Sequence, residues 1–506
     1  MKTTMYRLTS KLIFIASLAL TPGLGPAQAA DDVIATNSTA SALQLPSVFG
    51  DNMVLQQNQP VPVWGWSRPG TDVTVKFGGQ TRHARAGDDG RWEVRLNSLK
   101  ASSQPADLVI EAGETRTLTN ILVGEVWFCS GQSNMEKPIG KQPGQKPCFN
   151  YEQELAASDF PEIRLFKAHT ALAAMPEKDV TKPSGWQMCN SNSLEAIKFS
   201  AVGYFFGREI HNQLKVPVGL VESSWGGTRI EPWTPPVGFK MVRSLAGLAA
   251  PLSATNKLAN TTPMAIYNAM IAPLTHFAMR GALWYQGESN CMGKQPDGAI
   301  YTDKMEALIR SWRQLWGEGD FPFYYVQIAP FKYFSGNTRR APYADALPEI
   351  WEAQARALRI PNTGMIVTTD LADDVKDIHP RNKLDVGKRL AFVALNKTYG
   401  RKDIVCSGPM YKKIKIQGNK AVLSFNDADG GLVSKDGQPL TWFTIAGADG
   451  KFVPAEAMIT NGNIVVSSPD VAKPVAVRFA WSEIAQPNLF NGAGLPAVPF
   501  RTDRDQ

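Results

Sequence analysis

Five stretches of the chain are mainly apolar and show little alternation with polar residues. They are residues 123–129, 216–221, 281–285, 323–328 and 364–369. Unbroken apolar strands are typical of a parallel sheet that is covered on both faces. Between two of these stretches, apolar residues over 305–316 recur at i, i+3, i+4 and i+7, which predicts a helix. Strands that alternate with helices predict a doubly wound α/β core.

Four of the apolar stretches are followed at once by a cluster of polar residues. The clusters are 130–134 (SGQSN), 222–229 (ESSWGGTR), 286–290 (QGESN) and 370–379 (DLADDVKDIH). In an open α/β sheet, the carboxyl ends of the strands line the crevice that binds ligands. We therefore expect these four clusters, which are far apart in the sequence, to converge on one pocket.

The regions on either side of this core have a different pattern. Apolar and polar residues alternate in Val73-Thr-Val-Lys-Phe77 and in Trp92-Glu-Val-Arg-Leu96, with glycine-rich breaks between such runs, and alternation returns after residue 403. Period-two alternation between glycine-containing turns predicts strands. We expect an N-terminal β-domain over 45–120, a central α/β domain over 121–402 and a C-terminal β-rich domain over 403–506.

The first 29 residues have the pattern of a secretory signal peptide. Lys2, Arg7 and Lys11 accompany a short apolar stretch at 12–20, and Ala27-Gln-Ala29 fits the small-residue cleavage rule. The apolar stretch is too short to cross a bilayer, which takes roughly 20 residues. We expect an exported protein, periplasmic or secreted, with no stable membrane anchor. Residues 30–44 are small and polar, which predicts a disordered lead-in.

Charge and metal-ligand patterns narrow the class of partner. The formal net charge of +7 falls to +4 without the leader, which carries three basic residues and no acidic one. No dense run or stripe of Lys and Arg is present, so we do not expect a nucleic-acid partner. The five histidines and five cysteines form no HExxH or CxxC pattern, and we expect neither a metal nor another cofactor. Cys129 lies inside an apolar stretch, which favours a buried thiol over a disulfide.

A serine and a histidine in the polar clusters have the pattern of a nucleophile and its base. Ser133 lies in Gly131-Gln-Ser-Asn-Met135, at an expected strand-to-helix turn, and His379 precedes an expected helix over 382–396. The positive end of that helix would disfavour the imidazolium form of the histidine. Acyl transfer through a serine needs such a pair and a group that orients the imidazole. Asp377 is the first candidate for this group, and the alternatives are Asp370, Asp373, Asp374, Glu288 or a dyad without an acid.

The same chemistry requires N–H donors for the tetrahedral oxyanion. The backbone N–H of Ser133 is one candidate, and the pair Gly226-Gly227 offers another because glycine lets the backbone come close to a ligand. Gln286 offers a side-chain amide as a third donor, although a buried core amide is an equal alternative. Ser224 is a weaker candidate for the nucleophile. Met135 stands where Gly-x-Ser-x-Gly requires glycine, which excludes an ordinary α/β-hydrolase elbow.

These motifs resemble those of the sialate O-acetylesterase family, a branch of the SGNH-type hydrolases. The matching stretches are VFGDNMVLQQNQPVPVWGW (48–66), GEVWFCSGQSNME (124–136), SSWGGTRIEPW (223–233), YNAMIAPL (267–274), ALWYQGESN (282–290), DIHPRNKLDVGKRLA (377–391) and GLPAVPFRTD (494–503). The resemblance implies a three-layer α/β/α catalytic domain between β-domains, and removal of acetyl groups from sugar hydroxyls. It implies Ser133 as nucleophile, His379 as base, and Gly227 and Gln286 in the oxyanion hole. Many SGNH hydrolases place the acid three residues before the histidine, where this chain has Lys376.

An O-acetylated sugar or glycan is the expected substrate, and the sequence leaves its identity open. The carboxylate of a sialic acid would require a cation, and Arg229, Arg381 and Lys383 are candidates, although an Arg close to Glu231 is also typical of a structural ion pair. Acetylated plant polysaccharides such as xylan or xyloglucan would require no cation. The substrate-binding candidates are Trp225, Arg229, Trp233, Tyr285 and Glu288, and the aromatic ones are equally typical of a core.

Two other classes of function remain open at this point. A catalytically inactive carbohydrate-binding protein would keep the fold without turnover. A peptidase or lipase would keep the chemistry and change the leaving group. The oligomeric state and the pairing of the cysteines do not follow from the sequence.

Overall fold

A path of seven strands forms the middle of the sheet that carries the polar clusters. The structure is a computed structural model that describes residues 43–253, 255, 257–337 and 339–503. The strand order is β13-β12-β11-β7-β10-β8-β9, and all neighbours are parallel except β8 and β9. Along the chain, the strands next to β7 are added first on the β10 side and then on the β11 side. The strand order therefore reverses at β7, and ligands bind at such a point in open α/β sheets. The bounds are β7 Thr115–Gly131, β8 Phe160–Lys167, β9 Gln187–Cys189, β10 Val218–Ser224, β11 Gly281–Tyr285, β12 Phe323–Val326 and β13 Thr363–Ile366.

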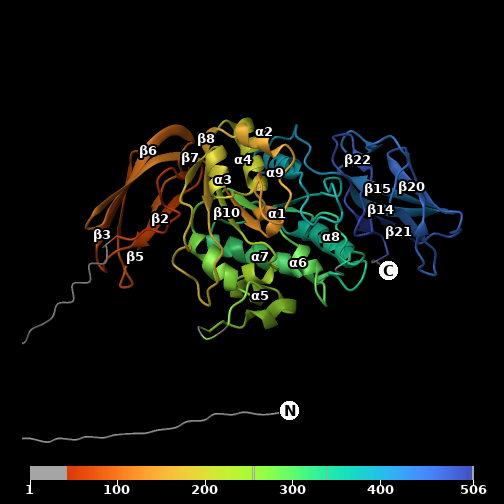
Figure 1. Ribbon diagram of the computed structural model, residues 1–506, viewed down its shortest axis with the longest axis horizontal. Coiled ribbons are helices and arrows are strands. Elements are labelled where there is room, and N and C mark those ends of the chain that lie inside the picture. Colours follow the sequence, from red (N-terminus) through yellow and green to blue (C-terminus); the bar gives the residue numbers. More distant parts are fainter. Residues whose placement is uncertain (1–42, 254, 256, 338, 504–506) are drawn as a thin grey trace, which may run out of the picture. The chain divides into compact units, whose positions relative to one another are not determined.

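Helices cover both faces of this sheet. Trp127 on β7 packs against Phe206 of α4 with ring centroids 4.9 Å apart, while the next residue, Phe128, packs against Trp312 of α7 at 5.7 Å. Successive strand residues point to opposite faces, so α4 and α7 lie on opposite faces (Figure 1). α9 packs beside α4. The bounds are α1 Ser133–Glu136, α2 Tyr151–Ala156, α3 Ser191–Ala196, α4 Ala201–Leu214, α5 Pro236–Met241, α6 Glu288–Cys291, α7 Ile300–Trp316, α8 Ala346–Arg356 and α9 Lys383–Lys397.

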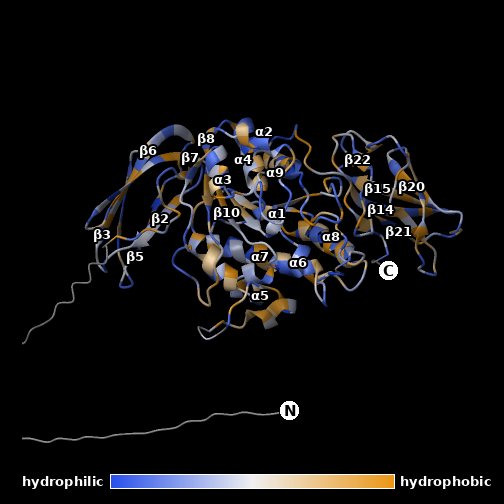
Figure 2. Cartoon of the chain, viewed as in Figure 1, coloured by the Kyte–Doolittle hydropathy of each residue, from blue (hydrophilic) through white to orange (hydrophobic). Residues whose placement is uncertain are grey.

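The helices that cover the sheet are amphipathic, and α8 is an example. Leu347, Ile350 and Trp351 are fully buried at helical spacing. Hydrophobic and hydrophilic residues share this helix in Figure 2, so one face packs on the core while the other meets solvent. Burial of each such side chain stabilises the fold by roughly 1.5–3 kcal/mol.

The N-terminal strands are continuous with the central sheet through β7. This strand spans 17 residues, and the domain boundary expected at residue 120 falls inside it. Its first half pairs with β6 in antiparallel fashion, and β1 joins it in parallel register. The N-terminal part is therefore not purely antiparallel. The bounds are β1 Val54–Gln56, β2 Val61–Trp66, β3 Asp72–Phe77, β4 Gln80–Arg85, β5 Arg91–Leu96 and β6 Ser102–Glu111.

The residues after 403 form short, mainly antiparallel strands. Ion pairs hold this part to the core, among them Arg501 with Glu352 at 2.9 Å and Lys435 with Asp370 at 3.4 Å. The bounds are β14 Met410–Gln417, β15 Lys420–Asn426, β16 Leu432–Ser434, β17 Phe443–Ala446, β18 Val453–Pro454, β19 Glu456–Thr460, β20 Asn463–Ser467, β21 Ala476–Phe479, β22 Leu489–Asn491 and β23 Phe500–Arg501.

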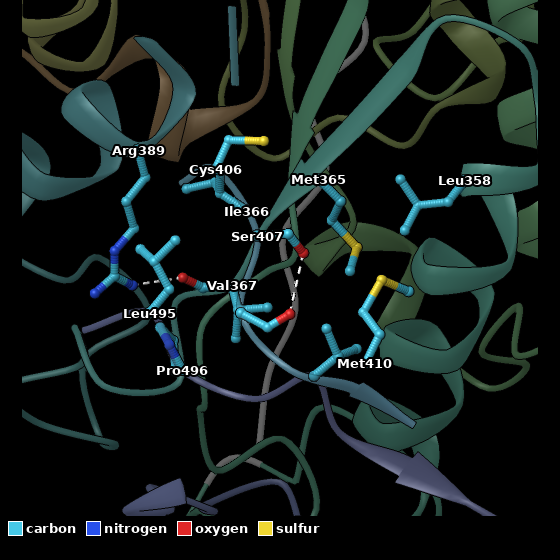
Figure 3. A pocket seen from close by; sticks show the side chains of 12 residues that line it. Leu358, Met365, Ile366, Val367, Arg389, Cys406, Ser407, Met410, Leu495 and Pro496 are labelled. Atoms are coloured by element: carbon cyan, nitrogen blue, oxygen red, sulfur yellow. Dashed lines mark hydrogen bonds between the residues drawn. The ribbon is translucent and has the colours of Figure 1, made fainter. Parts of the chain in front are cut away.

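A small cavity lies where the C-terminal part meets the core (Figure 3). Its volume is about 20 Å³, and its walls include Met365 from β13 and Met410 from β14. Arg389 on α9 donates to the carbonyl of Val367 at 2.7 Å beside it. A void of this size holds about one water molecule. It is a packing gap and too small for a sugar.

The α/β class and the C-terminal strands confirm the expected fold, and several boundaries differ. The helix expected over 382–396 is α9, and the run at 281–285 is β11. β8 and β9 are additional strands that the apolar runs did not reveal. The expected leader and almost all of the lead-in lie outside the described residues. The prediction of a disordered lead-in is wrong for its last two residues, because Leu43 is buried and Gln44 pairs with Trp66. Among the described residues, no helix is long and apolar enough to cross a membrane.

A buried carboxylate on β7 ties the sheet to its neighbours. Glu125 is 1% exposed and accepts hydrogen bonds from Gln57 at 2.7 Å, from the Arg280 guanidinium at 2.7 Å and from the Tyr399 hydroxyl at 2.9 Å. These donors come from the segment after β1, from the residue before β11 and from the end of α9. One side chain therefore fixes the middle of β7 against three other parts of the chain.

We expect Arg280→Met to destabilise the protein by about 3 kcal/mol, because the substitution removes the positive charge that pairs with Glu125 and leaves this carboxylate buried without it. The free energy of unfolding, from urea titration followed by circular dichroism, measures the effect. Arg310→Met is the matched control, since Arg310 forms an exposed pair with Glu306 on α7 that contributes about 0.3–0.5 kcal/mol. Equal losses in the two variants would contradict the role of Glu125.

Candidate active site

The nucleophile candidate begins a short helix at the carboxyl end of the central strand. β7 ends at Gly131, whose φ of 139° lies in the region that favours glycine, and a Cβ there would overlap the carbonyl group of Tyr285. The glycine therefore allows the ends of β7 and β11 to approach closely and the chain to turn after β7. Ser133 follows as the first residue of α1, and it is partly exposed.

The structure brings Ser133 and His379 together across 246 positions of sequence. The His379 Nε2 atom lies 2.9 Å from Ser133 Oγ, which is hydrogen-bonding distance. The side chain of His379 is 18% exposed, so the pair opens to solvent on one side. The spatial pairing that the motifs predicted is present.

None of the candidate acids forms a hydrogen bond to the other imidazole nitrogen. Asp377 is the nearest, with Oδ1 3.9 Å from His379 Nδ1, and the same oxygen accepts the backbone N–H of His379 at 2.9 Å. Asp370 pairs with Arg389, and Asp373 accepts the backbone N–H of Arg381. Asp374 accepts a hydrogen bond from the backbone N–H of Lys376, and Glu288 accepts one from the side-chain amide of Asn134. Asp377 thus shapes the histidine loop and acts on the ring through its charge.

The surroundings of His379 favour the neutral base. Burial is the largest cause that lowers the pKa of His379, and Lys383 is the second; together with Lys137 and Arg340 they bring it to about 4. The carboxylate of Asp377 raises the pKa and is outweighed. The lone pair on Nε2 is therefore available to accept the Ser133 proton at neutral pH.

Asn134 joins the nucleophile turn to the histidine loop. Its side-chain N–H₂ donates to the carbonyl oxygen of Ile378, the residue before His379, at 3.0 Å, and to Glu288 Oε1 at 2.5 Å. Its carbonyl oxygen accepts from the ammonium of Lys383 at 2.6 Å. One buried amide therefore connects the neighbours of both reactive residues.

Lys383 and Glu288 are charged side chains buried at the floor of the site. Burial lowers the pKa of Lys383 to about 7 and raises the pKa of Glu288. The Lys383 ammonium also lies 5.1 Å from the centre of the Tyr285 ring, which is favourable for a cation. Lys383 was a candidate for a substrate carboxylate, but it is fully buried beneath Asn134 and cannot reach one.

Two backbone amides can serve the oxyanion. The N–H groups of Ser133 and Gly227 have no hydrogen-bond partner within the described part of the chain. Gly227 is exposed and has a φ of 74°, with open space where a Cβ would point. A Cβ added at the preceding Gly226 would lie 3.2 Å from the Ser133 Cβ, and the Gly226 N–H donates to Glu136 Oε2 at 2.7 Å. Glu136 thereby holds the glycine turn beside the serine.

Gln286 is not available as an oxyanion donor, which corrects that prediction. Its side-chain nitrogen lies at 3.1 Å from Gln132 Oε1, 3.1 Å from the carbonyl of Thr228 and 2.6 Å from Asn290 Oδ1. Its oxygen accepts from the Tyr301 hydroxyl at 2.7 Å. The amide is fully buried and satisfied, so Gln286 stiffens the pocket wall.

Most of the predicted substrate-binding residues are also corrected. Trp233, Tyr285 and Glu288 are buried, and a sugar cannot stack on them or reach them. Arg229 forms ion pairs with Asp297 at 2.5 Å and Glu231 at 3.3 Å. Trp225 remains a candidate, because it is half-buried and its backbone N–H donates to the Gly131 carbonyl at the nucleophile turn.

The sequence analysis did not identify Asn134 or Glu136 as functional, although both lie in the Ser133 motif. An amide directly after the nucleophile was the available signal for Asn134. The five cysteines are free, and Cys129 is buried as predicted. Within the described residues, no group of three or more His, Cys, Asp or Glu side chains is arranged to hold a metal.

Comparison with known proteins identifies the family to which this site belongs. Residues 123–396 match the family described as carbohydrate esterase, sialic acid-specific acetylesterase. The chain is 30% identical to the sialate O-acetylesterase of Pongo abelii, over 93% of this chain and 95% of that protein. The chain belongs to the sialate O-acetylesterase family. It is 29% identical to the sialate O-acetylesterase of Homo sapiens, over 92% of this chain and 94% of that one.

A solved structure agrees with this membership. The crystal structure of a carbohydrate acetylesterase from Xanthomonas citri is 36% identical, with a TM-score of 0.82 over 91% of this chain and 100% of that chain. The sialate O-acetylesterase family consists of carboxylic ester hydrolases, so the protein is a carboxylic ester hydrolase with carbohydrate acetylesterase function. The resemblance inferred from the motifs is confirmed.

We expect kcat/KM to fall on the acid side with a midpoint near pH 4, because the base must be neutral and the pKa of His379 is about 4. In Lys383→Met the midpoint moves to higher pH, since the loss of a nearby positive charge raises the pKa of His379. The pH–rate profile and a histidine NMR titration measure both. Lys388→Met, on the same helix, serves as the control. A midpoint near 6.5 in the wild-type protein would contradict this account.

Asn134→Ala is expected to lower kcat by about 10²-fold with little change in KM, because a shift of the serine relative to the histidine disturbs the reacting geometry. Steady-state kinetics measures the split between the two constants. Asn192→Ala, at an exposed position of α3, is the control. A rise in KM with unchanged kcat would show that Asn134 binds substrate and does not position the pair.

Proposed function

We propose that the protein is an exported serine esterase that removes acetyl groups from sugar hydroxyls through an acetyl-serine intermediate. The observation that carries the proposal is the 2.9 Å contact between Ser133 Oγ and His379 Nε2 at the carboxyl edge of the sheet. Membership of the sialate O-acetylesterase family supports an acetylated sugar as substrate. The leader pattern of residues 1–29 supports export to the periplasm or the medium.

The first half of the reaction forms the acetyl-serine. Ser133 Oγ attacks the acetyl carbonyl carbon while His379 Nε2 takes the hydroxyl proton. The carbonyl oxygen becomes an oxyanion and accepts hydrogen bonds from the backbone N–H groups of Ser133 and Gly227. The tetrahedral intermediate then collapses as the imidazolium returns its proton to the sugar oxygen. The deacetylated sugar hydroxyl leaves.

The second half releases acetate by the same route. His379 takes a proton from a water molecule, whose oxygen attacks the acetyl-serine carbonyl. The bond between the carbonyl carbon and Ser133 Oγ breaks, and the imidazolium reprotonates the serine. The charge of Asp377, 3.9 Å from Nδ1, stabilises the imidazolium that forms in each half.

Ser133→Ala is expected to abolish release of acetate from p-nitrophenyl acetate and from acetylated sugars, because Ser133 is the only hydroxyl among the described residues that is hydrogen-bonded to His379. Acetate and p-nitrophenol release measure this, and an unchanged melting temperature shows that the variant is folded. Ser224→Ala is the control, since the Ser224 hydroxyl is buried against Glu222 at 2.7 Å.

Three outcomes would contradict the proposal in different ways. Turnover that survives Ser133→Ala would rule out the acetyl-serine mechanism. Binding of glycans without any turnover by the wild-type protein would favour an inactive carbohydrate-binding protein. Faster turnover of peptides or long-chain esters than of acetyl esters would favour a peptidase or lipase.

A further inference from the structure

A carboxylate lies on the same side of the nucleophile turn as the reactive serine. Glu136 is the last residue of α1 and comes three residues after Ser133. Residues three apart in a helix are neighbours on its surface. The side chain of Glu136 is partly buried, and neither half of the acetyl transfer uses it directly. A titratable group therefore stands beside the nucleophile without a part in the chemistry of the serine and the histidine.

The carboxylate of Glu136 holds the glycine turn that follows β10. Its Oε2 atom accepts the backbone N–H of Gly226 at 2.7 Å. A hydrogen bond to an ionised carboxylate is roughly twice as strong as one between neutral groups. A Cβ added at Gly226 would lie 3.0 Å from this oxygen and 3.2 Å from the Ser133 Cβ. The turn, the carboxylate and the serine are thus packed closely together.

The groups on both sides of Gly227 are fixed by hydrogen bonds. The backbone N–H of Trp225 donates to the carbonyl of Gly131 at 3.0 Å, and the hydroxyl of Thr228 donates to the carbonyl of Trp225 at 2.8 Å. The peptide group that carries the N–H of Gly227 lies between these anchors, and this N–H has no partner within the described residues. A bond to the N–H of Gly226 therefore restricts the direction in which the N–H of Gly227 points.

A buried ammonium offsets part of the cost of burying the Glu136 charge. Burial raises the pKa of Glu136, whereas the charge of Lys167 and the N–H of Gly226 lower it. The Lys167 ammonium, at the end of β8, lies 3.1 Å from Glu222 of β10, and the two side chains are 10% and 0% exposed. Glu222 also accepts the backbone N–H of Ser200 at 2.8 Å. The ends of two strands thus support the carboxylate that holds the turn.

We propose that Glu136 is a positioning residue that orients the backbone N–H of Gly227 toward the oxyanion. The inference rests on the proposed function and adds to it the group that orders the oxyanion hole. An N–H group is most effective when it is oriented before the negative charge develops. Glycine has more backbone freedom than any other residue, so a turn of two glycines needs a partner that fixes it. Glu136 acts through the turn and does not contact the substrate.

Three substitutions of Glu136 separate its hydrogen bond from its charge. Glu136→Ala removes both, Glu136→Asp keeps the charge on a side chain that is one methylene group shorter, and Glu136→Gln keeps an acceptor oxygen without the charge. We expect kcat for p-nitrophenyl acetate to fall by about 30-fold in the first two variants and by less than about threefold in Glu136→Gln. KM stays unchanged in all three, because the oxyanion forms only in the transition state.

A tetrahedral inhibitor reports the oxyanion hole directly. The boron of methylboronic acid accepts an electron pair from Ser133 Oγ while His379 takes the hydroxyl proton, and one oxygen of the anionic adduct occupies the oxyanion position. We expect the inhibition constant to rise in Glu136→Ala by about the factor by which kcat/KM falls. In Glu136→Gln it stays within about threefold of the wild-type value. A loss of packing alone would instead lower the melting temperature and leave the two variants alike.

The matched control is Glu195→Ala, because Glu195 is an exposed carboxylate on the short helix α3. We expect this variant to keep the wild-type kcat and inhibition constant. A wild-type kcat in Glu136→Ala, an unchanged inhibition constant in that variant, or equal losses in Glu136→Gln and Glu136→Ala would overturn the positioning role. Failure of the esterase mechanism itself is distinguishable, because it appears as turnover that survives Ser133→Ala.

Discussion

The hydrogen bonds of Asn134 are the interaction on which the active site depends. Ser133 is fixed by the end of β7, whereas His379 arrives on a loop after β13, the far edge strand of the path. The histidine loop must cross β12 and β11 to reach the serine. The amide of Asn134 bonds the carbonyl of Ile378 at the end of that crossing. Reactive residues on a loop need such a partner on a rigid element, because a shift of about 1 Å is costly for catalysis.

A buried positive charge beneath Ser133 and His379 explains why His379 remains neutral and able to accept a proton. The ammonium of Lys383 would be expensive to bury alone, and Asn134 and the Tyr285 ring compensate for part of that cost. Its positive charge then lowers the pKa of His379 by disfavouring the imidazolium. The same side chain thus stabilises the junction and sets the protonation state of the base. Because the pKa of His379 is low, its ring needs a carboxylate chiefly when the imidazolium forms during the reaction. The charge of Asp377 can stabilise the imidazolium at that moment without a hydrogen bond to the ring.

The sequence predicted the elements whose physical signal is local. Continuous apolar runs predicted the buried parallel strands, and the Ser133 and His379 motifs predicted the reactive pair. β8 was missed because Glu162 and Arg164 interrupt its apolar residues. Gln286, Trp233 and Tyr285 were misplaced for a different reason: they lie at the end of a strand or in the turn that follows it, where the sequence does not show the direction of a side chain, and all three point into the core.

One carboxylate of the C-terminal part, Glu483, holds the loop that follows β12. Glu483 is buried and accepts the backbone N–H groups of Phe334 and Ser335, while its own carbonyl accepts the N–H of Phe331. These bonds hold the loop after β12 in place. A loop of this length has many conformations when free, and its ordering costs conformational entropy. The β-rich part offsets that cost by fixing the loop at several backbone groups, so a region far away in sequence holds a loop at the carboxyl edge of the sheet.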